Sequence, residues 1–292
     1  MPSSMVDVSD VSKTLYIDRY GISTLEEFTT RMYARFKNQS PQLVYVKAII
    51  LNTTEWTFDN GSTSKNLGSI DAFGYSDKYF TLKRAVPTAD IEESFTMKFE
   101  FYKDSGYTKK LEEVTKTVYA NIIDFRNSTE WTSELTDFED GTEQGWTLNL
   151  FSISQDASIE AGGYSAYYYL SGTTATKYPS IEKTISIPAG VTKAGIIFYY
   201  GAHLFSGWNG KYARFNYTRV YVNGELIFED YINAAVDYNP THKYIGWYQS
   251  SVDLTEYAGQ NITVKIEFEL HLDKTSSMWI KSALDDIIFA YK

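Results

Sequence analysis

The chain of 292 residues contains no cysteine, only three histidines and six prolines. The absence of cysteine excludes disulfide bonds, thiol nucleophiles and cysteine-ligated metals in one step. Because most small extracellular animal domains depend on disulfides, it also favours a microbial or viral protein. The histidines His203, His242 and His271 have no metal-ligand spacing, and none adjoins a serine or aspartate in a triad-like motif.

Positive charge is also scarce, since 27 Lys and Arg face 37 Asp and Glu for a net charge of −10. Such a chain lacks the basic footprint of a nucleic-acid binder or of a protein that binds an anionic membrane. No apolar run reaches the roughly 18 residues of a membrane-spanning helix. The first residues, Met1 to Met5, have no apolar core, so no signal peptide is predicted there.

Catalytic motifs are missing as well. The chain has no Gly-x-Ser-x-Gly, no P-loop and no Gly-x-Gly-x-x-Gly. Glu92-Glu93 and Glu112-Glu113 are acidic pairs, but we interpret them as solvated faces and not as a glycosidase pair. The sequence therefore predicts no catalytic residues and a protein that is not an enzyme.

What the chain has is tyrosine, 25 in all, within an aromatic fraction of 16%. Tyr, Phe, Thr and Val suit a pleated, half-buried surface, so an all-β fold is expected. Period-two alternation in the first half predicts strands, with one helical turn at Lys109 to Lys116 as an alternative. The expected strands lie at Phe28–Lys37, Leu43–Asn52, Phe95–Tyr102 and Val114–Asp124.

The same alternation continues in the second half. Asn223-Gly224 separates two apolar arms and is typical of a type I′ hairpin. Ile262 to Leu270 presents a complete apolar face to one side. Further strands are expected at Tyr164–Leu170, Ser180–Ile187, Ala194–Tyr200, Ala213–Val222 and Ile287–Tyr291.

The fold class expected is two β-sandwich domains in series. A polar stretch around Asn127-Ser-Thr separates them. The predicted organisation is a flexible segment at 1–12, a sandwich at 13–126, a linker at 127–135 and a second sandwich at 136–292.

The second half has an ordered set of short motifs. Asp137-Phe-Glu-Asp-Gly141 opens it, Gly162-Gly-Tyr-Ser165 and Phe198-Tyr-Tyr200 follow, and Ala283-Leu-Asp-Asp-Ile-Ile288 closes it. In this order they resemble MAM-type and cleaved-adhesin-type jelly rolls, and more distantly jelly-roll carbohydrate-binding modules. The chain departs from animal MAM domains in having no cysteine.

That resemblance implies a structural calcium ion where the opening and closing motifs meet. It gives Glu139 and Asp286 as carboxylate ligands, with Asp285 or Asp140 as further candidates, and carbonyls near Gly162 to Ser165. Calcium takes six to eight hard oxygens, which suits such a set. The alternative is that Glu139 and Asp285 cap turns and that Asp286 pairs with a lysine.

The first half has a softer likeness. Phe36-Lys-Asn38, Ala48 to Leu51 and Ser94 to Asp104 resemble the B, C and F strands of immunoglobulin-like modules in surface-layer and adhesion proteins. Without a disulfide, the core alone must hold the two sheets together. A second jelly roll is the alternative for this half.

Two surface features bear on function. Exposed aromatic rings stack on sugar rings, and the candidate residues for a glycan platform are Trp208, Tyr212, Trp247 and Tyr248. Sequons of the form Asn-x-Ser/Thr predict glycosylation in an exterior protein. They stand at Asn52, Asn60, Asn127, Asn216 and Asn261.

We therefore expect a non-catalytic structural or adhesion protein outside the cell, on a cell or virion surface, such as a cell-envelope module or a virion spike. Its partners would be proteins or further copies of itself, and it could also bind glycans. The alternative is a carbohydrate-binding module, which could be an accessory region of a glycoside hydrolase.

Overall fold

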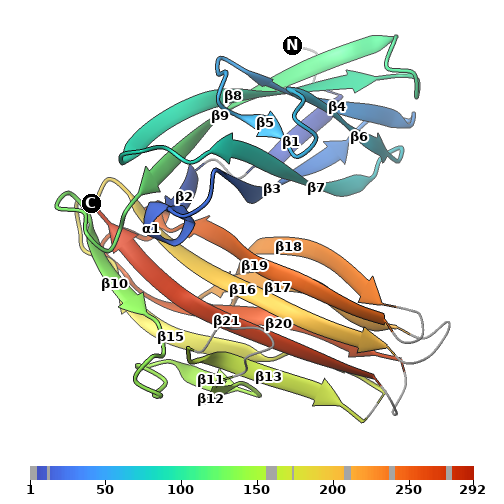
Figure 1. The fold of residues 1–292 in the computed structure, drawn as a ribbon. Helices are drawn as coiled ribbons and strands as arrows, with labels where there is room; N and C mark the ends of the chain where they lie inside the picture. The colour runs from blue at the N-terminus through green and yellow to red at the C-terminus, as the bar shows by residue number, and fades with distance from the viewer. Residues whose placement is uncertain are drawn as a thin grey trace. The chain divides into compact units, whose positions relative to one another are not determined.

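The computed structural model describes residues 5–11, 14–155, 163–172, 174–206, 212–236, 241–273 and 278–292. The chain divides into two compact units, Met1–Asp124 and Phe125–Lys292, each built from two β-sheets (Figure 1). The all-β prediction is confirmed. None of the helices in the described ranges has the length and hydropathy of a membrane span.

The N-terminal unit is a sandwich of a four-stranded and a five-stranded sheet. The first sheet has the order β1 (Val6–Val11), β3 (Glu27–Asn38), β7 (Tyr75–Ala85), β5 (Thr57–Phe58). The second has the order β2 (Thr14–Asp18), β9 (Lys110–Ile123), β8 (Ile91–Tyr102), β4 (Val44–Leu51), β6 (Ser64–Ile70). A short helix, α1 (Arg19–Ile22), follows β2.

This strand order is that of an immunoglobulin-type sandwich. β3 takes the place of strand B in one sheet, and β4 and β8 are neighbours in the other, as strands C and F are. β2 runs parallel to β9, whereas the other pairs are antiparallel. The helical alternative at Lys109 to Lys116 is wrong, because this segment belongs to β9 and pairs with β8 along its length.

Aromatic rings fill the space that a disulfide would otherwise bridge. Phe36 of one sheet lies 5.2 Å from Phe99 and 5.9 Å from Phe101 of the other, in edge-to-face contact. Trp56 is buried between Phe28 and Phe95. Such ring pairs add about 1 kcal/mol each beyond the area they bury, so the aromatic core contributes strongly to holding the sheets together.

A buried ion pair fixes the indole of Trp56. Glu93 accepts hydrogen bonds from Trp56 Nε1 and from Arg84 Nε, both at 2.7 Å, and the Arg84 side chain is 5% exposed. Glu112 accepts from the backbone N–H groups of Met5 and Val6. The sequence suggested that Glu93 and Glu112 are solvated. In the structure both carboxylates instead accept hydrogen bonds from groups on other segments of the chain.

The C-terminal unit consists of two six-stranded sheets. One has the order β12 (Ser152–Ser154), β13 (Ser165–Ser171), β21 (Met278–Tyr291), β16 (Ala194–Ser206), β19 (Thr241–Asp253), with β10 (Thr132–Thr136) also paired with β21. The other has the order β11 (Thr147–Asn149), β15 (Ser180–Ser186), β20 (Asn261–Leu272), β17 (Ala213–Val222), β18 (Glu225–Val236), with β14 (Ala175–Lys177) also paired with β20. A 3-10 turn, η1, spans Thr255–Tyr257.

Local sequence signals hold well in this unit. Asn223 and Gly224 both have positive φ, at 51° and 85°, as a type I′ turn between β17 and β18 requires. The apolar face of β20, Ile262 to Leu270, is buried. The two sheets of this unit pack against each other through buried apolar faces of this kind and form the predicted jelly-roll sandwich.

Two segments expected to lie outside the sheets belong to strands. Val6 and Val8 of the expected flexible segment are buried on β1, which pairs with β3. Thr132 of the expected linker begins β10, which pairs with the end of β21. Both were missed for one reason: polar residues alternate with too few apolar ones to give a strand pattern, and pairing with a distant strand decides the conformation.

We expect Arg84→Met to lower the free energy of unfolding by about 3 kcal/mol, because it leaves the Glu93 carboxylate half-buried without its cation. Urea unfolding followed by tryptophan fluorescence measures this. The matched control is Arg35→Met, whose pair with Asp77 is 40% exposed on the arginine side and should cost under about 1 kcal/mol. Equal losses of unfolding free energy in the two variants would show that the Arg84–Glu93 pair stabilises the protein no more than an exposed ion pair does.

Stability should also depend on Glu100. Burial raises the pKa of this carboxyl, but hydrogen bonds from Tyr102, Lys98 and Lys110 outweigh burial and bring the pKa from 4.5 to about 2. A lowered folded-state pKa stabilises the protein above the unfolded value and is lost as pH falls through the folded value. Urea unfolding should therefore show stability falling between pH 4.5 and about 2.

In Glu100→Gln this part of the pH dependence should disappear. Glu113→Gln, which removes an exposed partner of the same Lys110, serves as the control and should keep the wild-type slope. A Glu100→Gln protein with an unchanged slope would show that other carboxyls cause the loss.

Candidate functional site

The two acid-rich motifs of the C-terminal unit meet at one point of β21. β10 pairs with β21 from Ile287 onward, and β13 pairs with the same edge of β21 up to Leu284. Asp285 and Asp286 lie between these two partners, and β21 is bulged there relative to β16 on its opposite edge. The opening and closing motifs thus converge as the resemblance implied.

Two of the four predicted ligands have other partners. Asp286, with φ of 45° in the bulge, pairs with Arg126 Nη2 at 2.8 Å. Asp140 accepts from the backbone N–H and the hydroxyl of Thr142, both at 2.8 Å, and these bonds lower the pKa of Asp140. The alternative prediction was that Asp286 pairs with a lysine. In the structure it does pair with a basic side chain, which is the arginine Arg126.

Glu139 is held differently. Its Oε1 accepts from Tyr164 N at 3.1 Å, and a Cβ added at Gly163 would lie 2.3 Å from the same oxygen. Asp285 accepts from the N–H of Asp286 at 2.7 Å. Only a glycine at 163 lets the Glu139 carboxylate reach this backbone.

Among the described residues, no three histidine or acidic side chains form a group that could hold a metal ion. Glu139 and Asp285 remain as carboxylates that suit calcium, which would need several more oxygens from the backbone. Gly162, one predicted source of carbonyls, lies outside the described residues. The side chains alone do not make a calcium site.

The predicted glycan-binding residues that the structure describes are divided between the two sheets. Tyr212 precedes β17 in one sheet, and the guanidinium of Arg214 lies 4.1 Å from the centroid of its ring. Trp247 and Tyr248 are on β19 in the other sheet, where Trp247 is 38% exposed and Tyr248 contacts the buried Tyr200 at 5.9 Å. Trp208 lies outside the described residues.

A larger aromatic surface covers the outer side of the sheet that contains β21. We call it the His203 face, and it consists of Tyr169, His203, Phe205, His242, Tyr244, Trp279 and Lys281. The cross-strand register sets it up: His203 lies opposite Tyr244 and Lys281, and Phe205 lies opposite His242 and Trp279. Tyr169 lies opposite Lys281 and extends the row onto β13.

The rings of this face are packed against one another. The His203 ring stacks on Tyr244 with centroids 3.9 Å apart and meets the edge of Trp279 at 4.6 Å. Trp279 in turn stacks on Phe205 at 5.5 Å and contacts Tyr169 at 6.4 Å. Tyr244 is 64% and Tyr169 47% exposed, so ring surface at both ends of the row is open to solvent.

A hydrogen bond between two histidines locks the centre. His203 Nε2 and His242 Nδ1 are 2.9 Å apart, and one must donate to the other. His203 is 4% exposed, whereas His242 is at the surface. The pair keeps the rings in register, so a ligand would meet a preformed surface.

The sequence contained a signal for this face that motif reasoning missed. His203 and Phe205 alternate on β16, and His242 and Tyr244 alternate on β19, with the period of two that puts them on one side of a sheet. A search for metal spacing does not detect this pattern. The length of β16 beyond Tyr200, and β19 itself, were also not predicted.

The third histidine forms a hydrogen-bonded chain that the sequence did not suggest. His271 Nδ1 is 2.8 Å from Thr176 Oγ1, and its Nε2 is 2.7 Å from Asp273 Oδ1. Asp273 also accepts from Tyr212 N and lies 3.6 Å from Arg214. Thr176 pairs with His271 in the β14–β20 ladder. We therefore interpret these hydrogen bonds as stabilising the pairing of β14 with β20, and not as a nucleophile with its base.

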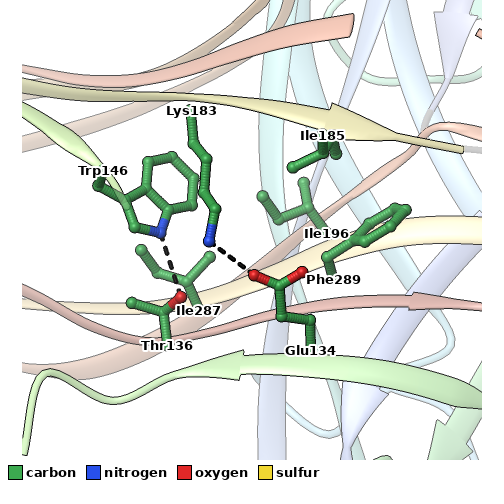
Figure 2. Close-up of a pocket in the computed structure, with 8 residues that line it drawn as sticks. All are labelled: Glu134, Thr136, Trp146, Lys183, Ile185, Ile196, Ile287 and Phe289. Carbon is green, nitrogen blue, oxygen red and sulfur yellow. Dashed lines mark hydrogen bonds and ion pairs between the residues drawn. The ribbon is translucent and has the colours of Figure 1, made fainter. Parts of the chain in front are cut away.

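A shallow recess in this unit is filled by its own side chains. Figure 2 shows the Lys183 side chain passing between Trp146 and Glu134, with isoleucines behind it. Lys183 Nζ is 2.6 Å from Glu134 Oε1, and Trp146 Nε1 donates to Thr136 Oγ1 at 3.1 Å. These bonds link a strand of one sheet to a strand of the other and make the recess a structural feature.

Four of the five sequon asparagines, Asn52, Asn60, Asn127 and Asn261, are exposed. Asn216 is half-buried on β17, and its Nδ2 donates to Glu269 at 3.0 Å. A glycan at Asn216 would replace one of the two Nδ2 hydrogens and would have to fit beside Glu269. Glycosylation at all five positions stays a prediction.

No known protein family matches the chain, and no curated protein is similar to it in sequence. Among solved structures, the K1 cleaved adhesin domain of Lys-gingipain from Porphyromonas gingivalis is 15% identical, covering 54% of this chain and 97% of that domain, with a TM-score of 0.36. A carbohydrate-binding module that recognises mannan is 12% identical, over 56% of this chain and 98% of the module, with a TM-score of 0.33. One specific for non-crystalline cellulose is 14% identical, over 53% and 91%, with a TM-score of 0.31. Because these TM-scores are low, the function is argued from this chain's own residues.

Proposed function

We propose that the protein is a non-catalytic binding protein displayed outside the cell, and that its C-terminal unit adheres to carbohydrate through the His203 face. The observation that carries this is a row of interlocked rings, with Tyr244 and Tyr169 exposed at its ends. A binding surface needs no catalytic geometry, and this one lies on paired strands that keep it rigid.

The chemistry of the face suits a sugar. Pyranose rings present C–H groups that pack on aromatic faces and hydroxyls that exchange hydrogen bonds with polar groups nearby. The His203 face combines ring surface from Trp279 and Tyr244 with hydrogen-bonding groups from His242 and Lys281. A purely apolar partner would remove water from these polar groups without offering them new hydrogen bonds, which is costly.

The setting is part of the same proposal. Two β-sandwich units in series, without cysteine and with exposed sequon asparagines, suit a cell-envelope module or a virion surface protein. The accessory region of a glycoside hydrolase is the alternative setting for the same binding surface. Gene neighbourhood distinguishes a virion protein, a cell-wall protein and an enzyme fragment.

Replacing Trp279 with alanine should weaken glycan binding by about tenfold or more, because it removes the ring that joins Phe205 to His203. A glycan array followed by isothermal titration calorimetry on the best ligand measures this. Tyr178→Ala, which removes a 45% exposed tyrosine elsewhere in the unit, is the control and should keep wild-type affinity.

Trp208→Ala tests the surface that the sequence suggested. If this change abolishes binding and Trp279→Ala does not, carbohydrate binds at the 207–210 turn and the His203 face is not the site. If no glycan on the array binds the wild-type protein, the proposed function is wrong.

We further propose that calcium stabilises the point where β10 and β13 meet β21. What supports it is the pair of acids Glu139 and Asp285 together with Gly163, which gives Glu139 its close approach to the backbone. Bound calcium would raise the melting temperature, and EGTA should lower it by several degrees. Equal melting curves with calcium and with EGTA would contradict the proposal.

A further inference from the structure

We infer that the His203 face is selective for acidic carbohydrate, such as chains that contain uronic or other anionic sugars. This inference rests on the proposed function and names the ligand class within it. It comes from the charges on the face and from where they lie relative to the rings.

The charge on the face is opposite in sign to that of the whole protein. The whole chain carries a net charge of −10, yet Lys281 is the one lysine, arginine, aspartate or glutamate among the seven residues of the face. Among its neighbours on the same side of β13, β16 and β21, within the described part of the chain, the one carboxylate is Asp285. Asp285 is four residues along β21 from Lys281, about 13 Å at the rise of a strand.

Lys281 is placed to meet an anion on a stacked sugar. It lies opposite His203 on one side and Tyr169 on the other. Its Nζ is 5.5 Å from the centroid of the Trp279 ring. An ammonium on a flexible stem can turn from the ring to a carboxylate, so a sugar stacked beside Trp279 brings its charge within reach of a salt bridge.

The histidine pair adds a donor. Where His203 Nε2 donates to His242 Nδ1, the Nε2 of the surface residue His242 carries a proton and donates to a ligand. This donor suits an acceptor such as a carboxylate or sulfate.

Other anionic or apolar partners fit less well. Single-stranded nucleic acid also stacks on rings, but it needs a line of cations to follow its phosphates, and Lys281 is the one lysine or arginine among the seven residues of the face. A protein partner would need roughly 800 Å² per side with an apolar centre. Here the centre is a pair of histidines.

The test uses matched sugars on the intact chain. An array of acidic oligosaccharides, each with its neutral counterpart, identifies the best pair, for example pentagalacturonate and its full methyl ester. Titration calorimetry at low salt should give about tenfold tighter binding of the acid, and the preference should fall towards one at about 1 M NaCl. Lys281→Met should remove the preference, so that the acid and its ester bind the variant with equal affinity.

Lys177→Met, on β14 of the other sheet, is the control and should keep the preference. A thermal melt of each variant confirms that it is folded. Equal affinity for acid and ester in the wild-type protein overturns the inference and leaves the proposed function standing. Failure to bind any sugar overturns both, and tighter binding of a ten-residue oligothymidylate than of any acidic sugar overturns the inference in favour of nucleic acid.

Discussion

The antiparallel pairing of β21 with β16 determines where the functional residues of the C-terminal unit lie. Twelve of the fourteen positions of β21 have a partner on β16, with one bulge near Asp286. At one end this register places Trp279 and Lys281 opposite Phe205 and His203. At the other end the bulge turns Asp286 towards Arg126. A one-residue slip would move every one of these side chains to the opposite side of the sheet, so the register must be strongly fixed.

The core is what fixes it. Leu204, Ile280 and Leu284 face inward and are fully buried, so a slip would expose them. Apolar alternation in the sequence predicts this inward side of the sheet, so the strands and the inward face of β20 could be predicted. The type I′ hairpin could be predicted from Asn223-Gly224 between two apolar arms. In the N-terminal unit the same signal located β3, β4 and β8, and the sheet order followed the immunoglobulin pattern.

The outward side could not be predicted in the same way. Tyr169, His203, Tyr244 and Trp279 are far apart in the chain and become neighbours only through the pairing of four strands. The sequence pointed to Trp208 because it lies in a predicted turn, with Tyr212, Trp247 and Tyr248 as residues that could join it. Turn position is a weak guide to which residues share one face of a sheet. β10 and β1 were missed for a related reason, since polar edge strands have no apolar period. The convergence of the two acid motifs, by contrast, was expected from the resemblance to jelly-roll families and not from any pattern of residues.

His203 shows why the face is better explained by binding than by stability. An imidazole that is 4% exposed loses its hydration, and one hydrogen bond to His242 compensates for that only in part. Leucine or valine at this position would fill the space beneath Tyr244 without that cost. Buried polar side chains that cost stability tend to occur at functional surfaces, because a polar group held in one orientation can recognise a ligand. Because Tyr244 covers His203, the role of this buried imidazole is to hold the surface residue His242 and the surrounding rings in the orientation in which a ligand would meet them.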